Sequence, residues 1–262
     1  HDLATTSPRP RHAMGSMTEP AQTASPRPGT PDPAALLAAL VAFDTVSARS
    51  NLPLIDWAEA YCRGHGAAVE RVPDPLGRKA ALLVSVGPFE TRPGYVLSGH
   101  SDVVPTDGQP WSSDPFALRE EGGRLYGRGT SDMKGFLAVC LALLPEMVAA
   151  DLATPIHLAI SYDEEVGCLG VRPLIARMLE RVPRPLGCFV GEPTGMDVVV
   201  GHKGKAAARL TFRGKASHSA LAPQGVNAVE YAARFIEHVR LSAEAIARDG
   251  ARDPLYDVPH TT

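Results

Sequence analysis

The sequence predicts an α/β protein. Its first domain should have a mainly parallel central sheet flanked by helices, and the first part of a smaller α+β domain should follow. From residue 31 onward, short apolar runs bounded by glycine or proline alternate with stretches in which apolar residues recur at helical spacing. After residue 200 the alternation changes to one strand-like stretch and one long helical pattern. We therefore expect a first domain over residues 31–201 and an incomplete second domain over residues 202–262.

Residues 1–30 differ from the rest of the chain. Proline, threonine, serine and alanine dominate there, and aliphatic residues are too sparse to offset the entropy lost on ordering. The stretch AMGSM at residues 13–17 resembles a cloning junction before a natural start at Met17, although an over-extended reading frame would look similar. We expect residues 1–30 to be a disordered tail or an extension added by cloning, and we exclude them from the fold.

The first half of the main domain should contain two helices and then two strands. Residues 34–43 and 54–63 carry apolar residues at helical spacing, and the second helix should end at Gly64. Residues 80–86 and 95–98 are short apolar runs of the kind that form buried strands.

The second half continues the alternation of helices and strands. Residues 136–149 form a long amphipathic pattern, residues 156–161 a buried strand, and residues 169–179 a further helix. Phe189 and Val190 end the next strand. In such a fold, ligands gather at the carboxyl ends of the strands.

The second domain is expected to begin with a half-exposed strand at residues 205–212, where apolar and polar residues alternate. A long helix should follow at residues 227–247, through Val229, Phe235 and Val239. The chain then ends after an extended segment at residues 253–256, which leaves too little sequence to complete that domain.

Composition excludes several classes of function. The formal net charge of -3 shows no basic excess for a polyanionic partner, so we expect no nucleic-acid binding. No apolar run approaches the roughly 18 residues of a membrane span. The four cysteines are scattered without CxxC spacing, and a secretory signal is lacking, so we expect a reduced, cytoplasmic location. Cys168 lies near an acidic pair and could be a nucleophile, but a lone cysteine in an apolar context is usually a packing residue.

The first candidate site segment is GHSDVVP at residues 99–105, directly after the strand at residues 95–98. Side chains alternate along an extended chain, so His100 and Asp102 should project to the same side, where the carboxylate can orient the imidazole. A neutral imidazole held in this way is a good zinc ligand. A histidine that is merely capped by its neighbour is an equally plausible interpretation of this segment alone.

The second segment, YGRGTSDMKG at residues 126–135, opens the helix at residues 136–149. Asp132 could be an ordinary helix N-cap. The crowded glycines favour a different role, because they permit the unusual backbone angles that would let a short carboxylate reach two cations. A phosphate-binding loop is the other candidate, but the GxGxxG spacing and a following Lys-Ser/Thr pair are both absent from this segment.

Carboxylates also follow the next two strands. Asp163, Glu164 and Glu165 come after the strand at residues 156–161, and Glu192 follows the strand that ends at Val190. Adjacent carboxylates repel each other, so they are either solvated or neutralised by cations. In a metal site, one glutamate would bind the metal while its neighbour accepts a proton from water.

A parallel sheet would bring all four segments to one edge. One histidine and several carboxylates would then meet, and this donor set suits Zn²⁺, with Co²⁺ or Mn²⁺ as substitutes and Mg²⁺ less suited. A shared aspartate implies two metal ions, which together can polarise a carbonyl group and generate hydroxide near neutral pH. The segments therefore predict a hydrolase.

The same segments resemble the M20 metallopeptidase family, in order and over about residues 33–262. The resemblance rests on GHSDVVP (99–105), GRG (127–129), DMKG (132–135), DEE (163–165), GEPT (191–194), SHSA (217–220) and GVNA (225–228). It implies a zinc-peptidase-like catalytic domain over residues 31–201 and a lid and dimerisation domain over residues 202–262. Three further segments, WSSDPF (111–116), YDEEVGC (162–168) and HKGK (202–205), resemble the family members that deacetylate N2-acetyl-L-ornithine.

The resemblance implies a role for each metal ligand. His100 and Glu192 would bind one zinc ion, Glu165 would bind the other, and Asp132 would bridge the two. A cis peptide bond is expected between Asp132 and Met133. The family's second-zinc histidine lies in a far C-terminal segment, and no residue here matches it.

The resemblance also implies which residues transfer the proton and stabilise the negative charge of the reaction. Glu164 would be the general base, Asp102 would orient His100, and His218 would stabilise the oxyanion from the lid. The substrate would be a small N-acyl amino acid, hydrolysed by a homodimer joined through the lid, where residues 227–247 would take part. The expected products are ornithine and acetate, a step of arginine biosynthesis. Desuccinylation of succinyl-diaminopimelate, aminoacylase or dipeptidase activity, and an inactive metal-binding homologue are the alternatives.

Overall fold

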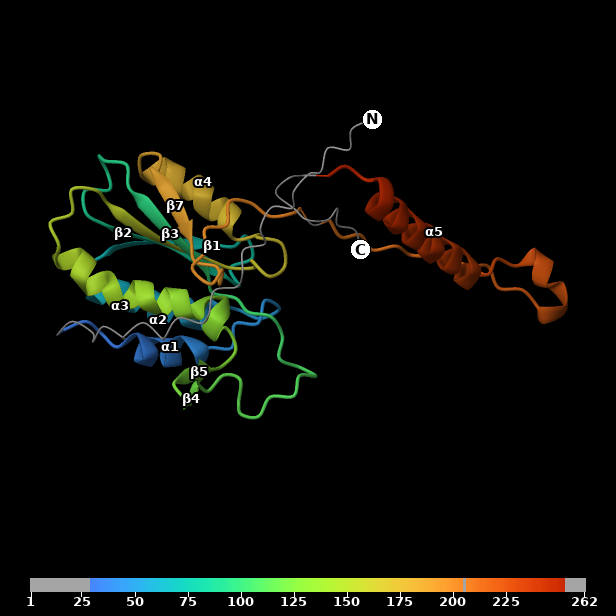
Figure 1. Ribbon diagram of the computed structural model, residues 1–262, viewed down its shortest axis with the longest axis horizontal. Coiled ribbons are helices and arrows are strands. Elements are labelled where there is room, and N and C mark those ends of the chain that lie inside the picture. The colour runs from blue at the N-terminus through green and yellow to red at the C-terminus, as the bar shows by residue number, and fades with distance from the viewer. Residues whose placement is uncertain (1–28, 205, 253–262) are drawn as a thin grey trace, which may run out of the picture. The chain divides into compact units, whose positions relative to one another are not determined.

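The computed structural model describes residues 29–204 and 206–252 (Figure 1). These residues form two compact units, one ending at Val198 and the other beginning at Val199, and we describe each by itself. The tail expected at residues 1–30 lies almost wholly outside the described residues. Among the described residues, no helix combines the length and the apolar character needed to cross a bilayer.

A five-stranded sheet organises the first unit. Its strands, in spatial order, are β1 (Ala68–Pro73), β2 (Ala80–Val86), β6 (Ile156–Ser161), β3 (Tyr95–His100) and β7 (Gly187–Val190). β3 runs parallel to both β6 and β7, whereas β2 runs antiparallel to both β1 and β6. The sheet is therefore mixed, and the expectation of a mainly parallel sheet is wrong.

The antiparallel part follows from the connections of β2. No helix separates β1 from β2 or β2 from β3, and parallel neighbours usually require a crossover helix. A tight turn joins β1 to β2: the Asp74 carboxylate accepts hydrogen bonds from the backbone N–H groups of Arg78 and Lys79, at 2.6 and 2.9 Å. The sequence pattern did not reveal β1, because this half-exposed edge strand lacks a continuous apolar run.

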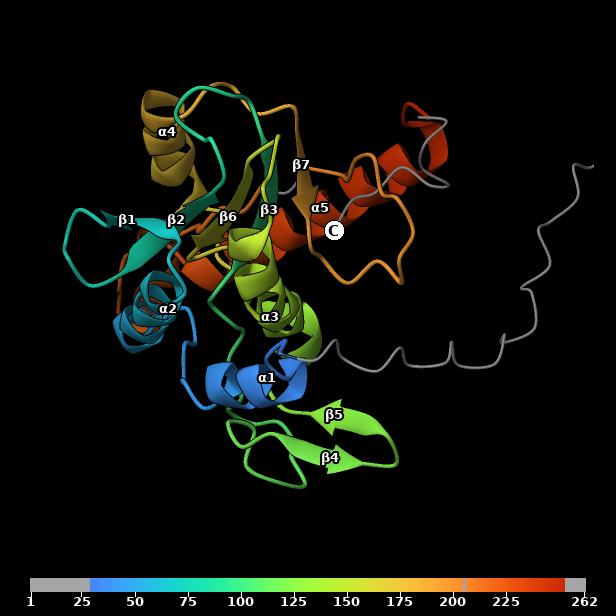
Figure 2. The same cartoon turned by 90° about the vertical axis from the view of Figure 1, so that its left-hand side faces the viewer.

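Helices cover both faces of this sheet, as the sequence predicts (Figures 1 and 2). On one face lie α1 (Pro33–Val41), α2 (Leu52–Gly64) and α3 (Gly135–Ala149), and on the other lies α4 (Val171–Arg181). β2 is buried along its whole length because its side chains alternate between the two cores. Leu137 and Leu141 of α3 are fully buried, and each such side chain contributes about 1.5–3 kcal/mol to folding.

A short hairpin lies outside the main sheet. It consists of β4 (Arg119–Glu121) and β5 (Arg124–Tyr126), which pair antiparallel. The turn residues Gly122 and Gly123 have φ angles of 59° and 74°, which glycine adopts readily and which match the twist of a two-residue hairpin. The sequence patterns did not identify this hairpin.

The second unit contains a 3₁₀ helix, η2 (Ser219–Gln224), and the long helix α5 (Ala228–Asp249). The Asn227 side chain caps α5 by accepting a hydrogen bond from the N–H of Val229 at 3.1 Å. α5 agrees with the helix expected at residues 227–247. The strand expected at residues 205–212 is not formed over residues 206–212, because an alternating stretch needs a neighbouring strand to pair with its backbone. Lys205 and the extended segment at residues 253–256 lie outside the described residues.

Candidate metal centre

The carboxyl ends of three adjacent parallel strands carry most of the candidate site. His100 is the last residue of β3, Glu164 and Glu165 follow β6, and Glu192 follows β7. Asp132 lies in η1 (Thr130–Lys134), the irregular turn that leads into α3. The sheet thus brings together the side chains that the sequence predicts to meet at one edge.

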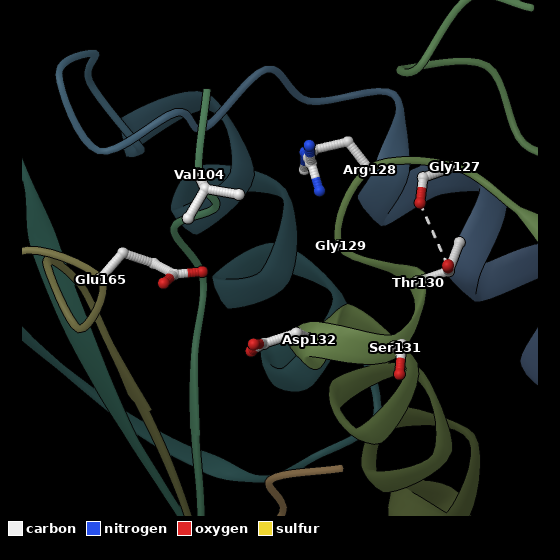
Figure 3. Close-up of a pocket in the computed structure, with 8 residues that line it drawn as sticks. All are labelled: Val104, Gly127, Arg128, Gly129, Thr130, Ser131, Asp132 and Glu165. Carbon is white, nitrogen blue, oxygen red and sulfur yellow. Dashed lines mark hydrogen bonds between the residues drawn. The ribbon is translucent and has the colours of Figure 1, made fainter. Parts of the chain in front are cut away.

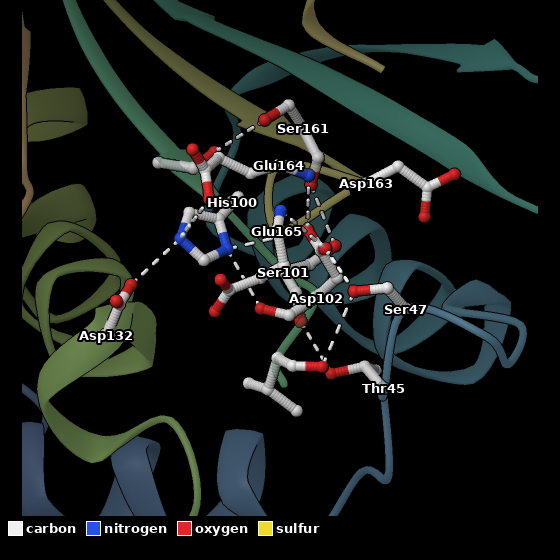
Figure 4. A network of polar contacts seen from close by, with 12 residues as sticks. Thr45, Ser47, His100, Ser101, Asp102, Asp132, Ser161, Asp163, Glu164 and Glu165 are labelled. Carbon is white, nitrogen blue, oxygen red and sulfur yellow. Dashed lines mark hydrogen bonds and ion pairs between the residues drawn. The ribbon is translucent and has the colours of Figure 1, made fainter. Parts of the chain in front are cut away.

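His100 is the centre of this arrangement (Figure 4). Its side chain is only 1% exposed. The Nδ1 atom lies 2.9 Å from the main-chain carbonyl oxygen of Asp102, and since a carbonyl only accepts hydrogen bonds, Nδ1 carries the proton. The Nε2 atom faces three carboxylates, at 3.0 Å from Asp132 Oδ1, 3.7 Å from Glu192 Oε1 and 3.8 Å from Glu164 Oε2.

The imidazole is oriented somewhat differently from the sequence expectation. The carbonyl oxygen of Asp102 makes the close contact, whereas the Asp102 carboxylate oxygen Oδ1 is 3.5 Å from His100 Nδ1. Burial disfavours the charged imidazole, but the hydrogen bond and the negative charge of Asp102, with a further contribution from Glu192, outweigh this effect and raise the pKa of His100 to about 9. A cation that binds Nε2 would therefore displace a proton near neutral pH.

The Asp102 carboxylate connects His100 to the loop after β6. It accepts hydrogen bonds from Ser47 Oγ at 2.7 Å and from the backbone N–H groups of Glu164 and Glu165, at 3.0 and 3.3 Å. Burial tends to raise the pKa of Asp102, but its hydrogen bonds from His100, Ser47 and Glu164 hold the pKa below its ordinary value. Asp102 therefore stays ionised and fixes the backbone that carries two other site residues.

The three successive acidic residues after β6 have different surroundings. Lys79 Nζ forms an ion pair with the Asp163 carboxylate and donates a hydrogen bond to the main-chain carbonyl of Ser47. Figure 4 shows Asp163 directed away from His100, while Glu164 and Glu165 belong to the site. Only two of the three carboxylates are thus available at the site. Sequence reasoning missed both Ser47 and Lys79, because neither lies in a segment with a recognisable pattern.

Close packing holds the turn that carries Asp132. Gly129 has a φ of 83°, and a Cβ atom there would lie 2.7 Å from Val103 Cγ1. The peptide bond between Asp132 and Met133 is cis, as the family resemblance implies. Lys134, not Asp132, occupies the N-cap position of α3, which excludes the capping role considered from the sequence.

Lys134 is fully buried beneath this turn. Its Nζ atom donates hydrogen bonds to the carbonyl oxygens of Leu40 and Phe43, at 2.9 and 2.8 Å, near the end of α1. Burial lowers the pKa of Lys134 to about 7, against the opposing effect of the negative charges on Asp44 and Asp102. Lys134 therefore links α1 to the turn that presents Asp132.

Among the described residues, two groups of side chains have donor atoms close enough to hold a cation. One consists of His100, Glu164 and Glu192 and the other of His100, Asp132 and Glu165, with donor atoms within 4.8 Å of one another. Burial raises the pKa of Glu165 and of Glu192, and the charge of Asp132 raises both further. Bound cations would relieve the repulsion among these carboxylates. Imidazole nitrogen and carboxylate oxygen are both donors that zinc accepts, so the residues present fit zinc. Neither group combines Asp132 with Glu192, so the division of ligands between two metal ions remains a prediction.

Two other residues considered from the sequence, His218 and Cys168, belong to neither of these donor groups. His218 belongs to the second unit, where it caps η2 and its Nδ1 accepts a hydrogen bond from the N–H of Ala220 at 3.2 Å. Cys168 is exposed, with its Sγ atom 3.4 Å from Glu164 Oε1, so it is not a buried packing residue. Partial desolvation of the Cys168 thiol, together with the hydrogen bond to Glu164 and the negative charge of Glu164, raises the pKa of the thiol, which disfavours the thiolate that a nucleophile requires.

A pocket of about 270 Å³ opens beside the cluster. Asp132 and Glu165 line it together with Val104, Arg128 and the turn at residues 127–131 (Figure 3). The strand ends thus present a histidine and several carboxylates next to an open pocket, which is the donor set of a metal-binding site with room for a ligand.

Comparisons with known proteins identify the family. The chain matches the family model described as Peptidase family M20/M25/M40 over residues 96–257, and it belongs to this family. It is 38% identical over 232 residues to an acetylornithine deacetylase from Myxococcus xanthus, a match covering 87% of this chain and 59% of the relative. It is 34% identical to an acetylornithine deacetylase from Edwardsiella ictaluri (strain 93-146), covering 87% and 60%. The chain thus spans about 60% of the length of these relatives.

The fold is also found among solved structures. A tripeptidase from Staphylococcus aureus superposes with a TM-score of 0.54 at 17% identity, over 78% of this chain and 55% of that one. This similarity supports the α/β catalytic fold alone.

Proposed function

We propose that the protein is a zinc-dependent amide hydrolase that removes the acetyl group from N2-acetyl-L-ornithine and releases ornithine and acetate. The observation that carries the reaction class is the position of Glu164, whose carboxylate lies 3.8 Å from His100 Nε2 within the ligand cluster. A base beside metal ligands is the arrangement needed to activate water. The identity to the two acetylornithine deacetylases supports the choice of substrate.

Four side chains would hold the metal ions. His100 and Glu192 would bind one zinc ion, Glu165 would bind the second, and Asp132 would be shared by both; Co²⁺ could substitute for zinc. When bound, zinc polarises the amide carbonyl and lowers the pKa of water. Because the carbonyl oxygen of Asp102 holds the proton on Nδ1 of His100, Nε2 is the atom that would bind zinc once its own proton is displaced.

Side chains of the protein would transfer the proton and stabilise the oxyanion. Glu164 accepts a proton from the attacking water and then transfers that proton to the nitrogen of the leaving amine. The backbone N–H of Glu164 donates a hydrogen bond to the Asp102 carboxylate, so Asp102 fixes the position of the base relative to His100. His218 would stabilise the oxyanion from the lid domain, and α5 would contribute to a homodimer interface.

Assays of the full-length protein loaded with zinc would test this function. The rates of hydrolysis should be compared for N2-acetyl-L-ornithine, succinyl-diaminopimelate and a dipeptide, each with and without a chelator. The proposal expects chelator-sensitive release of acetate with the highest kcat/KM for N2-acetyl-L-ornithine. A higher kcat/KM for succinyl-diaminopimelate or the dipeptide would assign the protein to another reaction of the family. Stoichiometric zinc binding without any hydrolysis would identify an inactive metal-binding homologue.

A further inference from the structure

Arg128 is a positively charged residue beside the ligand cluster. It lines the pocket that also contains Asp132 and Glu165, and Figure 3 shows its guanidinium group at the pocket wall opposite these two carboxylates. Six other arginines of this unit form ion pairs with carboxylates, whereas Arg78, Arg92, Arg124, Arg172 and Arg184, like Arg128, form none with the described residues. The paired arginines are Arg49, Arg63, Arg71, Arg119, Arg177 and Arg181.

Arg128 has no such ion pair with any described residue. Its Nη2 atom donates to the Pro105 carbonyl oxygen at 3.2 Å and to Gln109 Oε1, and both of these partners are uncharged. Its Nε atom is buried without a hydrogen-bond partner in the described part of the chain. No carboxylate of the described residues therefore pairs with the guanidinium, which has more N–H donors than its two acceptors use.

The same contacts hold the guanidinium in one place. Its carbon lies 5.1 Å from the centroid of the Trp111 ring, within the range of a cation–π interaction. Trp111 Nε1 in turn donates a hydrogen bond to Gln109 Oε1 at 3.1 Å, so one amide oxygen accepts from both side chains. A cation that is held before a ligand arrives loses little conformational entropy when the ligand binds.

We propose that Arg128 is a specificity-determining residue that binds the α-carboxylate of the substrate, and this rests on the proposed function. Cations bound by Asp132 and Glu165 would offset the negative charge of these two carboxylates, so they would no longer repel a substrate carboxylate at Arg128. A planar guanidinium matches a carboxylate better than an ammonium group does. The pocket thus selects N-acyl amino acids with a free carboxylate over the corresponding amides.

The test compares Arg128→Gln and Arg128→Lys with the unaltered zinc-loaded, full-length protein. Each is assayed with N2-acetyl-L-ornithine and with its α-carboxamide. Arg128→Gln should raise KM for the carboxylate by about 10- to 100-fold, the usual effect of losing a hydrogen bond to a charged group. KM for the carboxamide should change little, and Arg128→Lys should give an intermediate loss. Arg124→Gln, an exposed substitution on β5, serves as the matched control.

Zinc content and melting temperature are measured in parallel, because a purely structural role for Arg128 would alter them. An equal loss for carboxylate and carboxamide, or no change in KM for either, would overturn the proposal. Calorimetric titration of the two compounds into the unaltered protein and Arg128→Gln gives a second readout that does not require turnover. A protein that hydrolyses neither compound yet binds only the carboxylate through Arg128 would contradict the proposed function and leave this inference supported.

Discussion

The carboxylate of Asp102 accepts a hydrogen bond from the backbone N–H of Glu164 at 3.0 Å, although 62 positions separate the two residues in the chain. The main-chain carbonyl of Asp102 meanwhile orients His100. A single residue thus sets the position of both the histidine ligand and the loop that carries the proposed base. Ser47 completes this arrangement by donating its hydroxyl hydrogen to the other carboxylate oxygen of Asp102.

Replacing Ser47 with alanine should lower kcat/KM by about tenfold and destabilise the protein by about 1–3 kcal/mol. The reason is that a buried carboxylate oxygen loses a hydrogen-bond donor. Steady-state kinetics and urea unfolding would measure both effects. Ser50→Ala is a suitable control, because Ser50 is exposed in the same loop and bonds only to main-chain groups: it donates to the Arg78 carbonyl and accepts from the backbone N–H of Leu52. Equal effects of the two substitutions would exclude a special role for Ser47.

Substituting glutamine for Glu164 should leave zinc content unchanged and reduce kcat by at least about 10²-fold. Glutamine has nearly the same shape but cannot accept the proton from water, and general-base catalysis commonly contributes about 10²- to 10⁴-fold. Metal analysis and kinetics on the same preparation would separate binding from catalysis, with exposed Glu120→Gln on β4 as the control. Full activity in Glu164→Gln would refute its role as the base.

Replacing Glu192 with alanine should lower the amount of zinc bound per protein molecule, in contrast to Glu164→Gln. Glu192 Oε1 lies 3.7 Å from His100 Nε2, and its removal takes one oxygen donor from the cluster. Metal analysis after dialysis would measure the loss, and the rise in melting temperature on adding zinc should be smaller than in the unaltered protein. Undiminished zinc content would show that Glu192 is not a ligand.

Lys134→Met should destabilise the first unit by about 1–3 kcal/mol. Methionine approximates the volume of lysine, but it removes the donor of the Phe43 carbonyl oxygen, while the Leu40 carbonyl oxygen still accepts from the backbone N–H of Phe43. A buried unpaired group costs about 1–3 kcal/mol. Urea unfolding would measure the change. An unchanged unfolding midpoint would mean that water replaces the ammonium group.

The buried His157 should make the protein less stable as the pH falls. Burial lowers the pKa of His157 below the ordinary value of 6.5. Below about pH 6.5 the imidazole is therefore protonated in the unfolded chain while it stays neutral in the folded protein. The contribution is therefore complete above the unfolded pKa and is lost as the pH falls toward the folded pKa. Urea unfolding at pH 7.5 and 5.5 should show a smaller loss for His157→Gln than for the exposed control His238→Gln. Equal losses in the two variants would contradict this assignment.

Local patterns predicted most of the regular elements of the first unit. The buried strands β2 and β6 have the expected bounds of residues 80–86 and 156–161, because continuous apolar runs identify strands that are covered on both faces. The edge strand β1 and the hairpin of β4 and β5 escaped prediction, since their exposed side chains need not be apolar. The strand expected at residues 205–212 shows the reverse failure, because alternation alone does not supply a pairing partner.

For the site, the order and chemical types of the residues were enough to nominate His100, Asp102, Asp132, Glu164, Glu165 and Glu192. These choices depend only on the ends of strands and on the chemistry of donor atoms, which are local properties of the chain. Three features required the folded structure: the direction of β2, the supporting contacts of Ser47 and Lys79, and the unpaired Arg128 in the pocket. Each depends on contacts between residues distant in sequence, and such contacts are set by packing and by the pairing of strands.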